Sequence, residues 1–299
     1  LDDTGLLDLM IKNFKFGRKS LIVFSPAVLG LLLMPGGALF SAPLVDKAGS
    51  EHLDDSRKAS INVWFRHILH LIYPLATALI IACEVAGLQT YSVIVFLSPF
   101  FVISLLLGLI FLLDKVNNEA TFEKFENSVN WLEFLKPLSI ILLAPIIDFV
   151  LKFFFGLKSA ATFIGVSMSL ILGIMLSKIQ FKPLTQVVKK AKPWDFFFLI
   201  LSIYLYQVFF KSSGIATLLK NINIPAWSLL LVISFIFGFL TGRVSTPLII
   251  LIPIYLVQFG HISALELAVM YYSTLLLSLI HISEPTRPRL ISYAVFCLK

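Results

Sequence analysis

Long apolar runs separated by short polar segments dominate the pattern of this chain. Five runs have about 17 to 22 residues each, enough to cross the hydrocarbon core of a bilayer as a modestly tilted helix. These runs are Ile68–Val85, Ser92–Leu113, Leu138–Phe155, Ser159–Ser177 and Trp194–Phe210. The pattern therefore predicts an all-α fold, a polytopic membrane helix bundle.

Two further apolar stretches are interrupted by residues that break helices. Leu21–Val45 is broken at Pro35-Gly36-Gly37, and Pro225–Phe259 is broken at Thr241-Gly242-Arg243 and again at Pro247. Broken backbone at membrane depth is tolerated only where protein buries it or where it lines a wet cavity. We therefore expect two re-entrant or broken helical hairpins inside the bundle.

The two interrupted stretches resemble each other. Thr4-Gly5-Leu6-Leu7 corresponds to Ser213-Gly214-Ile215-Ala216, and Ser41-Ala42-Pro43-Leu44 corresponds to Ser245-Thr246-Pro247-Leu248. Chance similarity between apolar segments is the alternative explanation. Since five spans, an odd number, separate the copies, the second copy enters the bundle from the opposite face. The pattern thus predicts inverted repeats, a common construction of secondary transporters.

Composition and loop charge extend this interpretation. Of 299 residues, 58% are hydrophobic and 14% are charged, whereas a soluble domain has about 25% charged residues. This excludes a soluble globular enzyme, a disordered chain and a disulfide scaffold. If the first interrupted stretch returns to its own side, sixteen Lys and Arg lie on one side and four on the other. The positive-inside rule makes the first side cytoplasmic and predicts a multi-pass protein of the cell (inner or plasma) membrane.

The C-terminal segment has a different character. Residues 277–299 resemble translated read-through of a sequencing adapter, because Leu277–Arg287 and Ile291–Lys299 match two such tags in order and spacing. A native basic tail is the alternative. We therefore expect a transmembrane, transporter-like domain over 1–276, truncated at both ends, and an adapter-derived artefact over 277–299. Cys83 is then the only cysteine of the domain, so no internal disulfide is expected.

Three motifs resemble the membrane family called domain of unknown function 401. They are Leu33–Asp46 (LMPGGALFSAPLVD), Trp64–Ile68 (WFRHI) and Thr241–Leu248 (TGRVSTPL). That family is distantly similar to the ion transporter superfamily, which includes carriers of citrate, gluconate, dicarboxylates and arsenite, and sodium/proton antiporters. In those carriers two oppositely oriented hairpins meet at the substrate site. Their tips often carry Ser-Asn-Thr, which this chain lacks, so the resemblance does not carry over their sodium-site chemistry.

The two breaks supply the candidate substrate-binding residues. Freed N–H groups and helix N-termini favour anions, and glycine lets the backbone approach a ligand. The candidates are Gly36, Gly37, Ser41, Thr241, Gly242, Arg243, Ser245 and Thr246. Arg243 is expected to be the counter-charge for an anion, because a charge between apolar arms is costly unless it is paired. The alternatives are two packed kinks without a ligand, and a structural ion pair of Arg243 with Asp148 or Glu84.

Two more residues are candidates for coupling transport to a proton or cation. Asp148 lies in the middle of an apolar run, with Lys152 one helical turn later, so a local neutralising pair is the alternative. His70 is a candidate proton relay. Arg66 is interpreted as a positive-inside anchor. His67 and His70 are three residues apart, but no further ligands cluster with them, so no metal site is expected.

These observations predict a secondary active transporter of a small organic or inorganic anion, coupled to H⁺ or Na⁺ and working by alternating access. No soluble-enzyme motif is present, and we expect neither an enzyme nor a cofactor. An intramembrane enzyme or lipid-processing protein, with His67, His70 and Asp148 converging, is the first alternative; a channel or structural subunit is the second. The expected partners are the lipid bilayer, the anion and the coupling ion, without nucleic acid, and a homodimer is left open.

Overall fold

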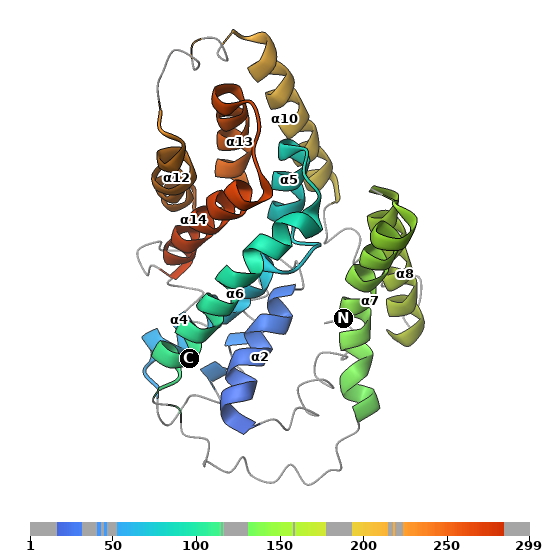
Figure 1. Cartoon of the computed structure of the whole chain (residues 1–299). Helices are drawn as coiled ribbons and strands as arrows, with labels where there is room; N and C mark the ends of the chain where they lie inside the picture. The colour runs from blue at the N-terminus through green and yellow to red at the C-terminus, as the bar shows by residue number, and fades with distance from the viewer. Residues whose placement is uncertain are drawn as a thin grey trace. The chain divides into compact units, whose positions relative to one another are not determined.

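The computed structural model describes residues 17–31, 41–42, 45–46, 53–114, 116, 131–157, 159–177, 193–214, 218 and 224–283. All regular structure in these ranges is helical, which confirms the all-α class (Figure 1). The chain divides into two compact units. One combines Leu1–Gly17 with Glu119–Leu199, and the other combines Arg18–Asn118 with Ile200–Lys299.

The first unit contains α7 (Trp131–Phe155) and α8 (Ser159–Ser177), and α10 (Pro193–Ser212) begins in it and continues into the second unit. α7 and α8 form an antiparallel hairpin. The Ser169 hydroxyl donates to the Ile140 carbonyl at 2.5 Å, and a Cβ on Gly165 would lie 2.6 Å from the Ala144 carbonyl oxygen. Gly165 therefore allows the two backbones to approach closely.

The second unit holds the remaining elements, which Figure 1 shows in blue, cyan and orange to red. They are α2 (Gly17–Leu31), α4 (Asp55–Ile68), η1 (Leu69–Leu71), α5 (Thr77–Ala86), α6 (Thr90–Leu112), η2 (Ser228–Ile233), α12 (Ser234–Thr241), α13 (Ser245–Phe259) and α14 (Ala264–Ser283). α14 is the central helix, since it contacts α4, α5, α6, η2, α12 and α13. Its side chains Leu267 and Tyr271 are fully buried in the larger hydrophobic cluster of this unit.

A reciprocal cap fixes the start of α14. The Ser263 hydroxyl accepts from the Glu266 N–H at 3.2 Å, and the Glu266 carboxylate accepts from the Ser263 N–H at 2.7 Å, which is a capping box. The Tyr255 hydroxyl of α13 donates to the same carboxylate at 2.8 Å. The turn between α13 and α14 is thereby held by polar bonds on both of its sides.

Helices α4 and α6 are joined by side chains of α4. The Trp64 indole N–H donates to the Ser104 carbonyl at 2.9 Å. Arg57 donates to the Phe111 and Leu112 carbonyls at 2.5 and 3.1 Å. These carbonyls lie in the last turn of α6, where no N–H group of the helix is left to donate to them. Arg57 also pairs with Asp114 just beyond the helix end.

Four of the five predicted apolar runs form helices, namely α6, α7, α8 and α10. The prediction of one helix over Ile68–Val85 is wrong. α4 ends at Ile68, and α5 begins only at Thr77 and ends at Ala86. Pro74 lies between them and disfavours helical backbone at Tyr73. With 10 residues, α5 is about 15 Å long, half the thickness of a hydrocarbon core.

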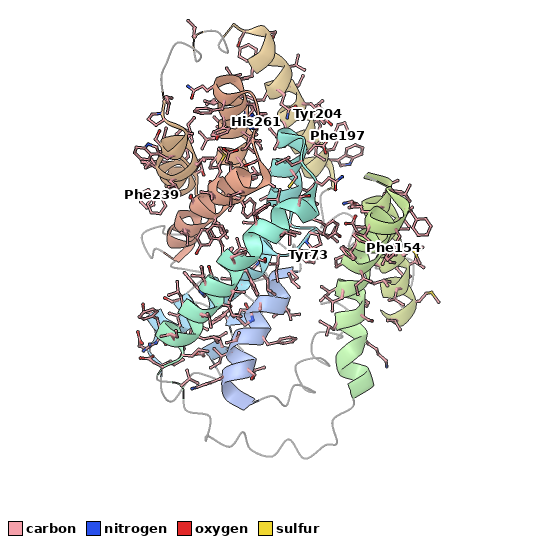
Figure 2. All side chains as sticks on the ribbon, viewed as in Figure 1. Tyr73, Phe154, Phe197, Tyr204, Phe239 and His261 are labelled. Carbon is pink, nitrogen blue, oxygen red and sulfur yellow. The ribbon has the colours of Figure 1, made fainter. Side chains whose placement is uncertain are left out.

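Two helices in the described ranges are long and apolar enough to cross a membrane. They are Thr90–Leu112, with a mean hydropathy of 2.8, and Leu138–Phe155, with 2.3. Only 22% of either window is buried, whereas the core helix of a soluble protein is buried over most of its length. Large apolar side chains accordingly point away from the ribbon, Phe154 of α7 and Phe239 of α12 among them (Figure 2).

Candidate functional site

The second predicted break has a defined geometry. α12 ends at Thr241, and Gly242 has a left-handed backbone with a φ of 59°. Glycine adopts this conformation without steric cost. The Thr241 hydroxyl donates to the Phe237 carbonyl at 2.8 Å and lies 3.0 Å from the Arg243 carbonyl, so that it closes the turn. The predicted break at Thr241-Gly242-Arg243 is thus confirmed.

The arm that enters this break is itself irregular. η2 is a π-helical stretch, and the Ser234 hydroxyl at its end donates to the Leu229 carbonyl at 2.6 Å. A π-helical turn widens the helix and is frequent at functional sites. Gly238 then brings α12 onto α14, because a Cβ there would overlap the Thr274 carbonyl oxygen. The backbone of α12 therefore packs directly against the backbone of α14.

Arg243 projects from the break with an exposed side chain. Among the residues that the structure describes, none forms an ion pair with its guanidinium. Its positive charge is therefore accessible to an anion. The other residues of the break begin α13: Ser245 is half-buried, and Thr246 is exposed in the first turn.

The predicted second interruption at Pro247 is wrong. Pro247 lies in the first turn of α13, which continues from Ser245 to Phe259. The first four N–H groups of a helix have no partner inside the helix, so proline is tolerated there. Only one break separates α12 from α13.

The first break is described only at its two flanks. Gly36 and Gly37 lie outside the described residues. Before the break, α2 ends at Leu31; after it, Ser41 is fully buried and donates to the Asn62 side-chain oxygen of α4 at 2.6 Å. Asp46 accepts from the Lys58 ammonium at 2.7 Å, and this hydrogen bond raises the pKa of Lys58. The segment after the break is thereby tied to α4 at two points.

The polar residues of α4 that meet the first break are spaced by one helical turn. They are Lys58, Asn62 and Arg66, and His70 follows at the same interval in η1. Residues four apart share one face of a helix. Lys58 and Asn62 bind the segment after the break, whereas Arg66 and His70 reach α2 before it: the His70 Nε2–H donates to the Gly30 carbonyl at 3.1 Å. One face of α4 and η1 therefore contacts both flanks of the break.

Arg66 occupies the middle of this polar face. A Cβ on Gly30 would lie 2.5 Å from the Arg66 carbonyl oxygen and 2.7 Å from its Cγ, so α2 rests directly on this residue. Nη1 of Arg66 is buried, and no described residue accepts a hydrogen bond from it. Burial lowers the pKa of Arg66 from its ordinary value. Arg66 as a whole is half-buried, and its interpretation as a positive-inside anchor stays a prediction.

The two histidines lie beside this arginine. The His67 and His70 rings meet edge to face with centroids 5.5 Å apart. The His67 Nδ1–H donates to the Val63 carbonyl at 2.7 Å. Burial, with repulsion from His70 and Arg66, lowers the pKa of His67 to about 3, so the ring is neutral. No group of three metal-ligating side chains occurs in the described part of the chain.

Asp148 belongs to the first unit and is fully buried. Its carboxylate pairs with the Lys152 ammonium at 2.9 Å, one turn along α7, and accepts from the Thr162 hydroxyl of α8 at 2.6 Å. The neutralising pair that the spacing allowed is therefore present. A coupling role for Asp148 stays a prediction.

The described flanks of the two breaks pack in different clusters of buried side chains. Val45 lies with Ile61 and Phe65, whereas Leu248, after the second break, lies with Leu79 and Tyr271. The meeting of the two breaks depends on Gly36 and Gly37 and stays a prediction.

Sequence reasoning missed Lys58, Asn62 and the buried Nη1 atom of Arg66. The signal was available in the four-residue interval that these residues share with His70, since that interval marks one helix face. The interval alone does not show which segment packs on that face, because burial depends on tertiary contacts.

The profile of a family described as "Protein of unknown function (DUF401)" matches residues 9–284. The match includes residues 277–284, and α14 continues without interruption to Ser283. No curated protein and no solved structure matches the chain.

Proposed function

This chain belongs to the DUF401 family, proteins of unknown function, and on that premise we propose that it is a secondary active transporter of a small anion, embedded in the cell membrane by multiple spans. The observation that carries the proposal is the break at Gly242. The apolar helix α12 ends there, and Gly242 has a left-handed backbone. The next residue, Arg243, is a cation without a carboxylate partner among the described residues.

The membrane environment is supported by the exposed apolar surface. Windows of α6 and α7 are apolar over the length of a bilayer core but only 22% buried. Water would make such surface costly, whereas lipid tails would not, because exposed apolar area in water costs about 25 cal/mol per Å². The excess of Lys and Arg on one side of the predicted bundle then orients the chain with that side in the cytoplasm.

The transport mechanism rests on the two interrupted stretches as inverted repeats. Broken helices near the middle of a membrane present helix ends and free backbone groups to a substrate. Gly36, Gly37 and Ser41 would contribute from the first stretch, and Gly242, Arg243 and Ser245 from the second. Rocking of one repeat against the other would open the site to each side in turn. Asp148 or His70 would carry the coupling proton or bind the coupling cation.

Uptake by the full chain in proteoliposomes tests this proposal. The probes are radiolabelled succinate, citrate and inorganic phosphate, each under an imposed pH gradient and an imposed Na⁺ gradient. We expect gradient-driven uptake of at least one probe, and a loss of about tenfold or more in Arg243→Ala, because one charge-assisted bidentate contact is worth at least that factor.

Lys136→Met is the matched control, since Lys136 is an exposed cation at the start of α7 outside both breaks. Its uptake should equal that of the wild type. Unchanged uptake in Arg243→Ala would remove Arg243 from the site. Absence of gradient-driven uptake of all three probes by the wild type would contradict the transporter proposal itself.

A further inference from the structure

The charges of α4 are paired at one end of the helix and unpaired at the other. Arg57 pairs with Asp114, and Lys58 pairs with Asp46 and Asp55. Asp114, Asp46 and Asp55 are therefore already paired with cations near the start of α4.

Arg66, two turns further along the same face, has no such partner among the described residues. Among the described residues no carboxylate lies within ion-pair distance of its guanidinium, and its neighbours His67 and His70 are basic groups. A buried charge normally has a partner, because removing it from water costs several kcal/mol. Nη1 of Arg66 is buried without an acceptor among the described residues, and an anion would supply that acceptor.

Residues of α2, α4 and η1 make specific contacts around Arg66. Gly30 leaves room for the Arg66 side chain directly under α2, and one turn on, the His70 ring bonds to the Gly30 carbonyl. One turn before, Asn62 holds Ser41, which follows the Pro35-Gly36-Gly37 motif by four residues. The main chain and Cγ of Arg66 thus lie against α2 at Gly30, one helical turn from the residues that bond to the two flanks of the first break.

We propose that Arg66 binds the negatively charged group of the substrate, a carboxylate or a phosphate-like oxyanion, at the first break. The planar guanidinium offers two parallel N–H donors that match such a group. This inference rests on the proposed function. It assigns the anion subsite of the transporter to Arg66, which the sequence pattern marks as a positive-inside anchor. Arg243 would then serve the second break.

Thermal unfolding of the full chain in detergent micelles tests the subsite without requiring transport. The probes are succinate, inorganic phosphate and sulfate, each compared with chloride at equal ionic strength. We expect at least one probe to raise the unfolding midpoint of the wild type in a saturable way. Arg66→Met should weaken the apparent affinity by about 100-fold or more, and Arg66→Lys by about tenfold, because lysine keeps the charge but loses the bidentate geometry.

A second measurement separates binding from a structural role. Without any probe, Arg66→Met should unfold at the same temperature as the wild type or higher, because the substitution removes a guanidinium nitrogen that is buried without an acceptor while keeping the aliphatic stem. A structural arginine with a permanent partner would give a lower midpoint instead. Gly30→Ala, which displaces the Arg66 main chain, should also weaken anion binding, whereas Lys136→Met should leave it unchanged.

The possible outcomes distinguish the anion subsite from the transporter proposal. Equal stabilisation of the wild type and Arg66→Met, or no stabilisation of the wild type by any probe, overturns the subsite. Stabilisation that depends on Arg66 in a chain that transports nothing keeps the anion site and removes the transporter. Uptake that depends on Arg243 but not on Arg66 keeps the transporter and removes this subsite.

Discussion

At the scale of single residues, the charged side chains divide into those that have partners and those that do not. Asp148 is buried with both a cation and a hydroxyl in contact. Arg66 has a buried nitrogen without a described acceptor, and Arg243 is exposed without a described carboxylate. The net charge therefore includes a bonded pair in one unit and, in the other, two arginines without a described carboxylate partner.

Substitutions at the Asp148–Lys152 pair separate structure from coupling. Lys152→Met should destabilise the protein by about 2 kcal/mol. Breaking a fully buried pair costs roughly 3–5 kcal/mol, and the cost is smaller here because 26% of the Lys152 side chain is exposed. Asp148→Asn combined with Lys152→Met should recover most of this loss, measured as the unfolding midpoint in detergent. Strictly additive effects would show that the two groups do not interact. If Asp148 couples transport, the double variant regains stability but not gradient-driven uptake.

At the scale of elements, close backbone packing decides where the helices lie. Gly165 seats α8 on α7, and Gly238 seats α12 on α14. The short α5, cut off by Pro74, packs against α13 directly after the second break. Apolar periodicity predicted α6, α7, α8 and α10 because each is one uninterrupted run. The prediction of one helix over Ile68–Val85 failed, because a hydropathy pattern does not show that a proline separates two helices.

A methyl group added at Gly238 tests the packing of the arm. Gly238→Ala should destabilise the protein by about 1–3 kcal/mol, since the new Cβ would overlap the Thr274 carbonyl oxygen, which is backbone and unable to move aside. Gly173→Ala on α8 is the control: its Cβ would lie 3.4 Å from the Ile140 side chain. That change should be neutral or stabilising by up to about 1 kcal/mol, because alanine favours helix. Equal unfolding midpoints in the two variants would contradict the contact.

At the scale of the whole molecule, two compact units each present apolar helices. Such a surface is compatible with lipid on its outer faces and protein on its inner ones, which is the premise of the proposed function. The orientation follows from loop charge rather than from the fold.

Site-directed labelling tests that orientation. In a Cys83→Ser, Cys297→Ser background, Lys182→Cys and Lys220→Cys lie on opposite sides of the predicted bundle. In intact cells an impermeant maleimide should label position 220 and not position 182, and both should react after the membrane is opened. Labelling of both from the same side would contradict the topology, and release of the chain from membranes by alkaline carbonate would contradict its insertion.

The helical class, the position of most helices and the break at Gly242 follow from the sequence, because these features depend on local backbone chemistry and on hydrophobic runs. It also identified Asp148 and Lys152 as neighbours, since one helical turn separates them. The tertiary structure was needed to show that Nη1 of Arg66 is buried without a described acceptor, that Ser41 and Asp46 bond to α4, and that Pro247 lies in the first turn of α13. Burial and partners depend on which distant segments pack together, and a hydropathy pattern carries no information on that pairing.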